Sequence, residues 1–119
     1  MPKPARSIPI WLGGFGEVAF ERAARLADGF IFGGGIDHCV EAWNQMRDRV
    51  SGLGRSVDDF GADLTALDRA GVAELAAKID AWREAGGTHA SVVTMGLGLD
   101  SVDAHIDYIA SVADALGLS

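Results

Sequence analysis

The stretch that decides the fold runs from Ile8 to Gly35 and reads IPIWLGGFGEVAFERAARLADGFIFGGG. Its first part, Ile8–Leu12, is a short apolar run of the kind that forms a strand buried on both faces of a parallel sheet. Residues Glu17–Ala27 have the composition of a helix, and Phe30–Phe32 begins a second buried strand. The stretch therefore predicts a βα unit followed directly by the next strand of the same sheet.

A glycine-rich loop separates the first predicted strand from the first predicted helix. It consists of Gly13, Gly14, Phe15 and Gly16. Glycine lets the backbone approach a ligand closely, and the free N–H groups of the first helical turn point toward an anion. We therefore expect this loop to hold a phosphate group, with a plain tight turn as the alternative. A second glycine run, Gly33–Gly35, follows the second strand. We expect it to make room at the mouth, with close access for a second ligand as the alternative.

The same alternation of strand and helix continues toward the end of the chain. Hydrophobic periodicity, capping residues and glycine stops define the elements. They are a helix from Asp37, its N-cap, to Ser51, a strand over Gly61–Leu67, a helix over Gly71–Ala85, a strand over His89–Met95, and a helix that Ser101 caps and that runs from Val102 to Leu116. The chain thus predicts four consecutive βα units in an α/β domain.

Composition and charge bound the class of protein. The 119 residues are expected to form a single domain, 1–119, and 49% of them are apolar. A net charge of -7 argues against a nucleic-acid partner. The single cysteine, Cys39, excludes an internal disulfide and a cysteine-built zinc site, and no metal site is expected. Since the sequence lacks a long apolar run and a signal-peptide core, we expect a soluble cytoplasmic protein without membrane contact.

Four βα units fit either a small doubly wound sheet or half of an eight-stranded (βα)8 TIM-type barrel. Residues Gly14–Ala19 match the pattern G-x-G-x-x-A, which favours a Rossmann-type dinucleotide-binding module. Such a module needs an acidic residue at the end of its second strand to hold a ribose hydroxyl. That strand ends in Phe32 and three glycines, and Asp37 comes slightly late, so the half-barrel is the preferred interpretation.

The segments IPIWLGG, AFERAARLADGF and WREAGGTHASVVTMGLG occur in an order that resembles the C-terminal half of the bacterial luciferase-like monooxygenase family. In particular, it resembles the branch of this family that uses a deazaflavin coenzyme as hydride carrier. The resemblance covers the chain from about Pro4 to Leu116. It is sharpest over Pro9–Gly14, Ala23–Gly29 and Trp82–Gly98.

Members of this family are full (βα)8 barrels, roughly two to three times as long as this chain. The resemblance implies that the four strands correspond to the fifth to eighth strands of such a barrel. It further implies a flavin- or deazaflavin-dependent oxidoreductase of the monooxygenase type, or a fragment of one. The implied coenzyme is deazaflavin or FMN, with its phosphate on Gly13, Gly14, Phe15 and Gly16. The family's first half-barrel, which supplies much of the contact with the reactive ring, has no counterpart in these residues.

Four side chains, the three histidines and the cysteine, come into consideration for chemistry, and one of them is a candidate. His38 follows Asp37 at the expected mouth and is the candidate for acid–base catalysis, with a solvated loop histidine as the alternative. Cys39 is expected to be a small helix residue and not a nucleophile. His89 is expected at the opposite end of the barrel, and His105 is expected to pack on the inner face of the last helix with a backbone partner.

A half-barrel leaves its first and fourth strands unpaired on their outer sides. Both edges, Ile8–Leu12 and His89–Met95, are apolar and lack a lysine that would discourage pairing. We therefore expect a homodimer in which two half-barrels close an eight-stranded barrel, or another homo-oligomer. A non-catalytic half-barrel that self-associates and binds phosphate-like anions is the alternative to an enzyme.

Overall fold

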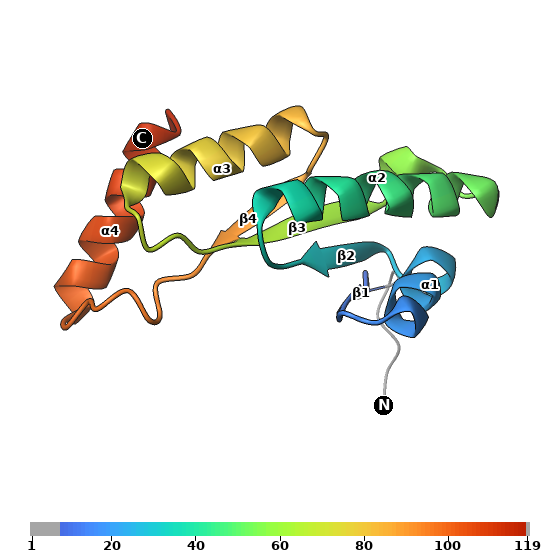
Figure 1. Cartoon of the computed structure of the whole chain (residues 1–119), viewed down its shortest axis with the longest axis horizontal. Helices are drawn as coiled ribbons and strands as arrows, with labels where there is room; N and C mark the ends of the chain where they lie inside the picture. The colour runs from blue at the N-terminus through green and yellow to red at the C-terminus, as the bar shows by residue number, and fades with distance from the viewer. Residues whose placement is uncertain (1–7, 119) are drawn as a thin grey trace.

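The computed structural model describes residues 8–118 and has an α/β fold built on one four-stranded parallel sheet (Figure 1). The strands lie side by side in chain order, β1-β2-β3-β4, which confirms the predicted run of four βα units. A helix follows each strand, and a short 3-10 helix, η1, precedes β3. The elements are β1 (Trp11–Gly13), α1 (Glu17–Leu26), β2 (Gly29–Phe32), α2 (Ile36–Gly52), η1 (Val57–Asp59), β3 (Gly61–Ala66), α3 (Val72–Glu84), β4 (His89–Val92) and α4 (Val102–Ala115).

The order of the strands determines where the helices lie. Right-handed crossovers between parallel strands in consecutive order place every helix on the same face of the sheet. The side chains of β2 agree, because Phe30 and Phe32 are buried beneath the helices while Ile31 points to the opposite face and is 40% exposed. A doubly wound sheet reverses its order beside the first strand and carries helices on both faces. The four described strands have no such reversal, which disfavours the Rossmann alternative.

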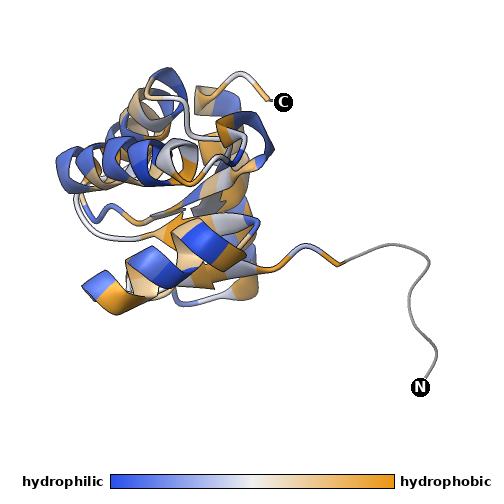
Figure 2. Ribbon diagram, turned by 90° about the vertical axis from the view of Figure 1, so that its right-hand side faces the viewer, coloured by the Kyte–Doolittle hydropathy of each residue, from blue (hydrophilic) through white to orange (hydrophobic). Residues whose placement is uncertain are grey.

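Aromatic side chains fill the space between the sheet and the helices. Phe32 lies between Trp43 of α2 and Trp82 of α3, with ring centroids 6.0 Å and 5.3 Å away. Trp43 also stacks on Phe60, which precedes β3. The indole N–H of Trp82 donates to the carbonyl of His89 at 3.0 Å and ties α3 to the start of β4. Figure 2 shows apolar strands beneath helices whose outward turns are largely hydrophilic.

The first strand is shorter than expected, because it begins at Trp11 and not at Ile8. Pro9 has no N–H to donate to a sheet ladder. The N–H of Ile10 donates to the carboxylate of Asp28 at 2.8 Å, so it is not offered to a strand. Ile8 and Ile10 are consequently 69% and 61% exposed, and their expected burial is wrong for the single chain.

The helix N-termini match the expected caps in one case and differ in the other. The Ser101 hydroxyl accepts the N–H of Ala104 at 3.1 Å, which confirms the cap of α4. The cap of α2 is Gly35, and the expected cap, Asp37, lies inside the first turn. Gly35 already has the extended backbone conformation that a capping residue needs, so the helix begins earlier than the sequence suggested.

The helices at the two edges of the sheet are less buried than their patterns predicted. On α1 the core residues are alanines, and Val18 and Leu26 are 70% and 68% exposed. On α4, Val112 is the only buried residue. This last helix packs against α3 and stands away from β4, as Figure 1 shows. Among the helices of residues 8–118, none has both the length and the apolar character needed to cross a bilayer.

The fourth strand is also shorter than expected. It ends at Val92, which pairs with Ala66 at the end of β3, and the last hydrogen bond between them runs from the N–H of Val93 to the carbonyl of Ala66 at 2.9 Å. Met95, the expected last residue of the strand, lies in the following loop and is 77% exposed.

The face of the sheet that carries no helix is partly covered by one indole. Trp11 lies across Gly29 and Gly61 of the two neighbouring strands, where any side chain would collide with it. Its ring meets that of His89 edge to face, with centroids 4.9 Å apart. Trp11 thus spans the amino end of the open face from β1 to β4.

The Arg55 side chain fastens the end of α1 to the segment before β3. Its guanidinium donates to the carbonyls of Ala24 and Ala27, both at 2.7 Å, and lies 5.7 Å from the ring centroid of Phe60. The last carbonyls of a helix lack partners within the helix and carry partial negative charge. A half-buried cation at this place therefore stabilises the α1 terminus.

We expect Arg55→Met to lower the free energy of unfolding by about 2 kcal/mol, because two charge-assisted hydrogen bonds are lost. Arg55→Lys should retain part of that stability, since lysine keeps the charge but lacks the rigid fork that bridges both carbonyls. Chemical denaturation measures both variants. The control Arg83→Met, on the exposed side of α3, should change stability by less than about 0.5 kcal/mol. An Arg55→Met effect as small as the control's would contradict the role.

Candidate functional site

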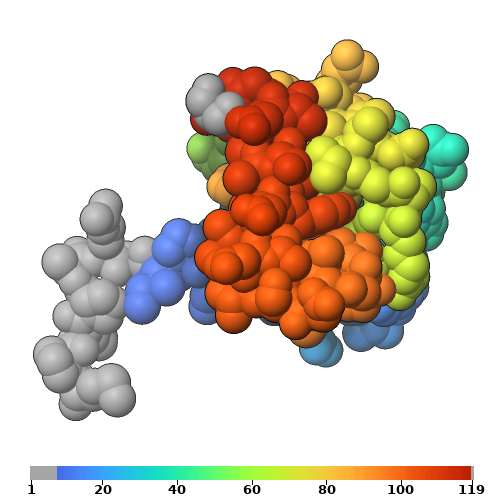
Figure 3. Space-filling model, turned by 90° about the vertical axis from the view of Figure 1, so that its left-hand side faces the viewer, coloured from blue at the N-terminus to red at the C-terminus, as the bar shows by residue number. Residues whose placement is uncertain are grey.

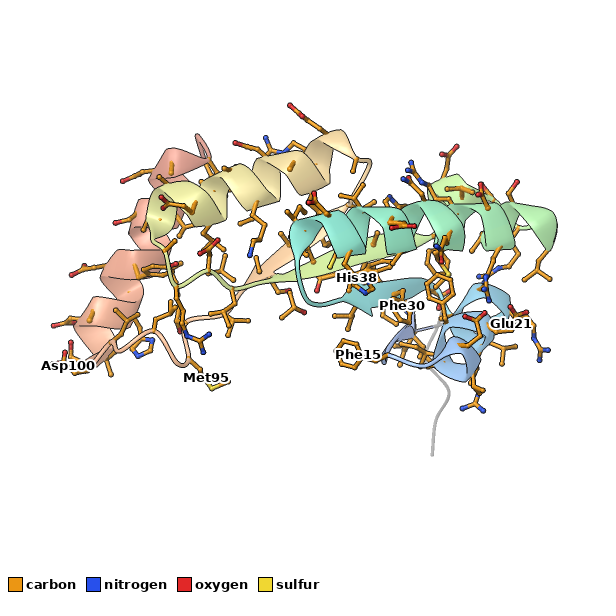
Figure 4. The ribbon with its side chains drawn as sticks, in the orientation of Figure 1. Phe15, Glu21, Phe30, His38, Met95 and Asp100 are labelled. Carbon is orange, nitrogen blue, oxygen red and sulfur yellow. The ribbon has the colours of Figure 1, made fainter. Side chains whose placement is uncertain are left out.

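A hollow at the carboxyl ends of β1 and β2 brings two predicted features together. It lies between the β1–α1 loop, the β2–α2 loop and the helices α1 and α2, and its volume is about 160 Å³. We call it the loop hollow. Figure 4 shows Phe15 of the first loop close to His38 of α2. The residues that line the hollow include Gly14, Phe15, Gly16, Phe20, Phe30, Phe32, Gly33, His38 and Cys39.

The glycine loop therefore meets His38, which the sequence placed only at the same end of the sheet. Three of the four predicted phosphate-binding residues line the loop hollow. The fourth, Gly13, is the last residue of β1 and does not contribute to the lining. Gly14 has φ +143°, a backbone conformation that other residues rarely adopt, so its position requires glycine.

Two helices begin beside the hollow without a side-chain cap. Gly16 caps α1 and Gly35 caps α2, and neither has a side chain to accept the N–H groups of the first turn. In the first backbone hydrogen bond of α1, the N–H of Phe20 donates to the carbonyl of Gly16 at 3.1 Å. The N–H groups between these two residues lie at the positive end of the helix dipole, where an anion is favoured.

The charged side chains around the hollow favour an anion less than its backbone N–H groups do. Glu17 stands in the first turn of α1, where its carboxylate forms an ion pair with Arg49 of α2. Arg49 also bonds Glu21 at 3.0 Å and lies 4.9 Å from the ring centroid of Phe20. The hydrogen bond to Glu17 raises the pKa of Arg49, which stays charged. Because the lining has no lysine or arginine, attraction for an anion must come from backbone N–H groups and His38.

An aromatic wall closes the hollow on the sheet side, and the sequence analysis did not anticipate it. Phe30 meets Phe20 and Phe32 edge to face, at centroid distances of 5.7 Å and 4.9 Å. The sequence signal for this aromatic wall was the pair of phenylalanines in the second strand. Such a pair is equally typical of an ordinary hydrophobic core, so it did not indicate a site. The volume of the hollow is well below the about 300 to 1,000 Å³ of pockets that enclose a drug-sized ligand. It fits a phosphate group and not a whole coenzyme.

The other predicted histidines lie away from the loop hollow. His89 begins β4 at the amino end of the sheet, and its Nδ1 lies 2.8 Å from the hydroxyl of Thr88. His105 is half-buried on α4, as expected, but the expected backbone partner is wrong. Its Nδ1 lies 2.8 Å from the hydroxyl of Thr94, so this pair ties α4 to the loop after β4.

One buried acid lies on the open face of the sheet. Both carboxylate oxygens of Asp63 accept from the Ser91 hydroxyl, each at 3.1 Å. Within residues 8–118, no three His, Cys, Asp or Glu side chains gather closely enough to hold a metal ion.

A scan against protein-family models finds no match for the chain, and a search of the curated proteins finds none either. Function is therefore inferred from the geometry of the loop hollow and from the sequence resemblance.

Cys39 lies at the base of the hollow and is fully buried. Burial raises the pKa of its thiol, an effect that the charge of Lys78 only partly opposes. The thiolate, which is the reactive form, is therefore disfavoured in the folded protein. Cys39 is thus a buried residue of α2, which agrees with the expectation of a small helix residue.

We expect the Cys39 thiol to react with an aromatic disulfide reagent about 100-fold more slowly in the folded protein than in denaturant, because reaction requires local opening. Stability should also fall as the pH rises above the ordinary cysteine range. The reason is that the unfolded chain, with the lower cysteine pKa, loses its proton first. Absorbance of the released thiol and denaturation at several pH values measure the two effects. Fast labelling of the folded protein would show that the thiol is accessible.

Proposed function

We propose that the loop hollow binds the phosphate of a flavin-type coenzyme, either deazaflavin or FMN. One observation carries the proposal: Gly14, Phe15 and Gly16 of the β1–α1 loop and His38 in the first turn of α2 line one hollow at the carboxyl edge of a parallel sheet. This edge is where α/β proteins bind their ligands. The resemblance to luciferase-like monooxygenases supports the same place for the phosphate.

The residues of the hollow fit a phosphate group. A side chain built at Gly16 would meet no atom within 4 Å, so the space over the start of α1 is open to a ligand. The unpartnered N–H groups of the first turn would donate to the phosphate oxygens. Phe15, which is 92% exposed, would offer its ring to the rest of the molecule. When bound, the coenzyme would supply the hydride chemistry for which the chain has no group of its own.

The proposed architecture is half of a (βα)8 barrel, equivalent to the fifth to eighth units of a luciferase-like enzyme. Consecutive parallel strands with buried side chains on the helix face support it. In this proposal the open face of the sheet is the barrel interior, and a second copy of the chain closes the barrel.

A non-catalytic half-barrel that binds phosphate-like anions is the second candidate. It is favoured by the small number of acid–base groups in the lining of the hollow. Besides the buried Cys39, the ionisable side chains of the lining are His38 and Glu17. The visible absorbance of the purified protein, before and after addition of FMN or deazaflavin, separates the two candidates. A retained chromophore supports the coenzyme, whereas binding of inorganic phosphate alone supports the anion-binding module.

We expect Gly16→Val to weaken FMN binding at least about tenfold, because the new side chain fills the space above the helix start. The backbone at Gly16, with φ −101°, accepts valine without strain, so the variant should fold. Gly35→Val is the matched control, since Gly35 is also a helix cap in open space but does not line the hollow. Quenching of FMN fluorescence measures both affinities. Equal affinity of wild type and Gly16→Val would disprove the phosphate site.

We expect His38→Ala to lower FMN affinity about threefold, because the imidazole can donate an N–H to a phosphate oxygen in a hollow whose lining has no lysine or arginine. The control His89→Ala alters a histidine at the far end of the sheet and should leave the affinity unchanged. If the loaded protein turns over a substrate, His38→Ala should also change the pH–rate profile. Unchanged affinity together with an unchanged profile would remove His38 from the site.

A further inference from the structure

The edge formed by α4 and β4 is apolar and open. Val102, Ile106 and Ile109 recur along α4 at helical spacing and are 75%, 57% and 49% exposed. Figure 3 shows α4 and the loop before it covering one side of the molecule with nothing packed upon them. A groove of about 330 Å³ runs between α3, α4 and β4, and we call it the α4 groove. Its lining includes Ala90, Val92, Ile109, Val112 and Leu116.

The opposite edge of the sheet also carries exposed apolar side chains. Ile8 and Ile10 precede β1 and project without cover, and Val18 and Leu26 are exposed on α1. Leu12 lies within β1, and Ile10 precedes the strand by one residue. Leu12 packs against the core of its own chain, whereas Ile10 has no helix over it.

The charges of the two edges are also complementary. Arg22 and Arg25 accompany Val18 and Leu26 on the outer face of α1. Asp103 and Asp107 flank the apolar row of α4, one helical turn apart. All four side chains are exposed, and among the described residues none of them belongs to an ion pair. Glu17 and Glu21 lie on the same surface of α1, but both pair with Arg49. The unpaired charges are therefore basic on α1 and acidic on α4, at opposite edges of one sheet.

We propose, building on the half-barrel architecture of the proposed function, that a second copy of the chain occupies the α4 edge. Its Ile8 and Ile10 enter the α4 groove, and its α1 lies along α4 with Arg22 and Arg25 opposite Asp103 and Asp107. In this arrangement β1 of the second copy runs parallel to β4 and extends the sheet by one strand. The apolar side chains of that strand then face the same layer of helices. A two-fold axis repeats this contact at the other edge, so both edges of both copies are closed at once.

The second copy fits better than an unrelated partner. The matching features, an isoleucine pair with a groove and two arginines with two aspartates, are carried by the same chain. A partner that covered only the α4 edge would leave Ile8, Ile10 and the β1 edge in water. A two-fold dimer covers both edges with one kind of contact, and this contact does not depend on the coenzyme site.

The test is a charge exchange between the two edges. Light scattering after size exclusion at micromolar concentration should give twice the mass of one chain for the wild type. Arg22→Glu with Arg25→Glu, and separately Asp103→Arg with Asp107→Arg, should each raise the dimer dissociation constant at least about tenfold through like-charge repulsion. The control Glu41→Arg with Asp48→Arg reverses two exposed charges on α2 and should leave the dimer unchanged.

Mixing provides the decisive measurement. One variant has two acidic edges and the other two basic edges, so an equimolar mixture should form heterodimers with affinity close to the wild type's. All four substitutions in one chain should restore the homodimer. A monomeric wild type, a dimer that neither reversal weakens, or a mixture that fails to pair would each overturn the proposal. Since no ligand is needed, these results are independent of whether FMN binds.

Discussion

Parallel pairing of short strands in chain order is the constraint on which the rest of this structure depends. Each parallel step requires a crossover helix, and consecutive right-handed crossovers put all helices on one face. The core therefore forms on that side, where Phe32 lies between Trp43 and Trp82. The other face receives Trp11, which lies over two glycines.

The same constraint gathers the functional candidates. Parallel strands all end at one edge, so the loops that follow β1 and β2 come together although their residues are far apart in sequence. There the glycine loop meets His38 over a wall of phenylalanines. We propose the hollow as an anion site in which backbone N–H groups and the helix dipole would supply the attraction, because its lining has no lysine or arginine. Its size suits one phosphate, and a coenzyme ring would have to lie outside it.

The same strand order leaves β1 and β4 as unpaired edges of the sheet in a single chain. In a single chain the outer rows of α1 and α4 find no neighbour, and α4 leans on α3 with Ile106 and Ile109 in water. Opposite charges lie beside these rows, on Arg22 and Arg25 at one edge and on Asp103 and Asp107 at the other. These exposed apolar rows and the charges beside them are the observations on which the proposed contact between two copies of the chain rests.

The sequence by itself determined the succession of βα units, the glycine loop and the Ser101 cap, because periodicity, glycine and capping chemistry act over a few residues. The edges were decided only by the tertiary structure. Ile8 and Ile10 fall outside β1 because Pro9 lacks an N–H and Asp28 takes the N–H of Ile10. The sequence likewise could not predict that the glycine loop and His38 line one hollow. That arrangement depends on β1 and β2 lying side by side, which is a property of the tertiary structure.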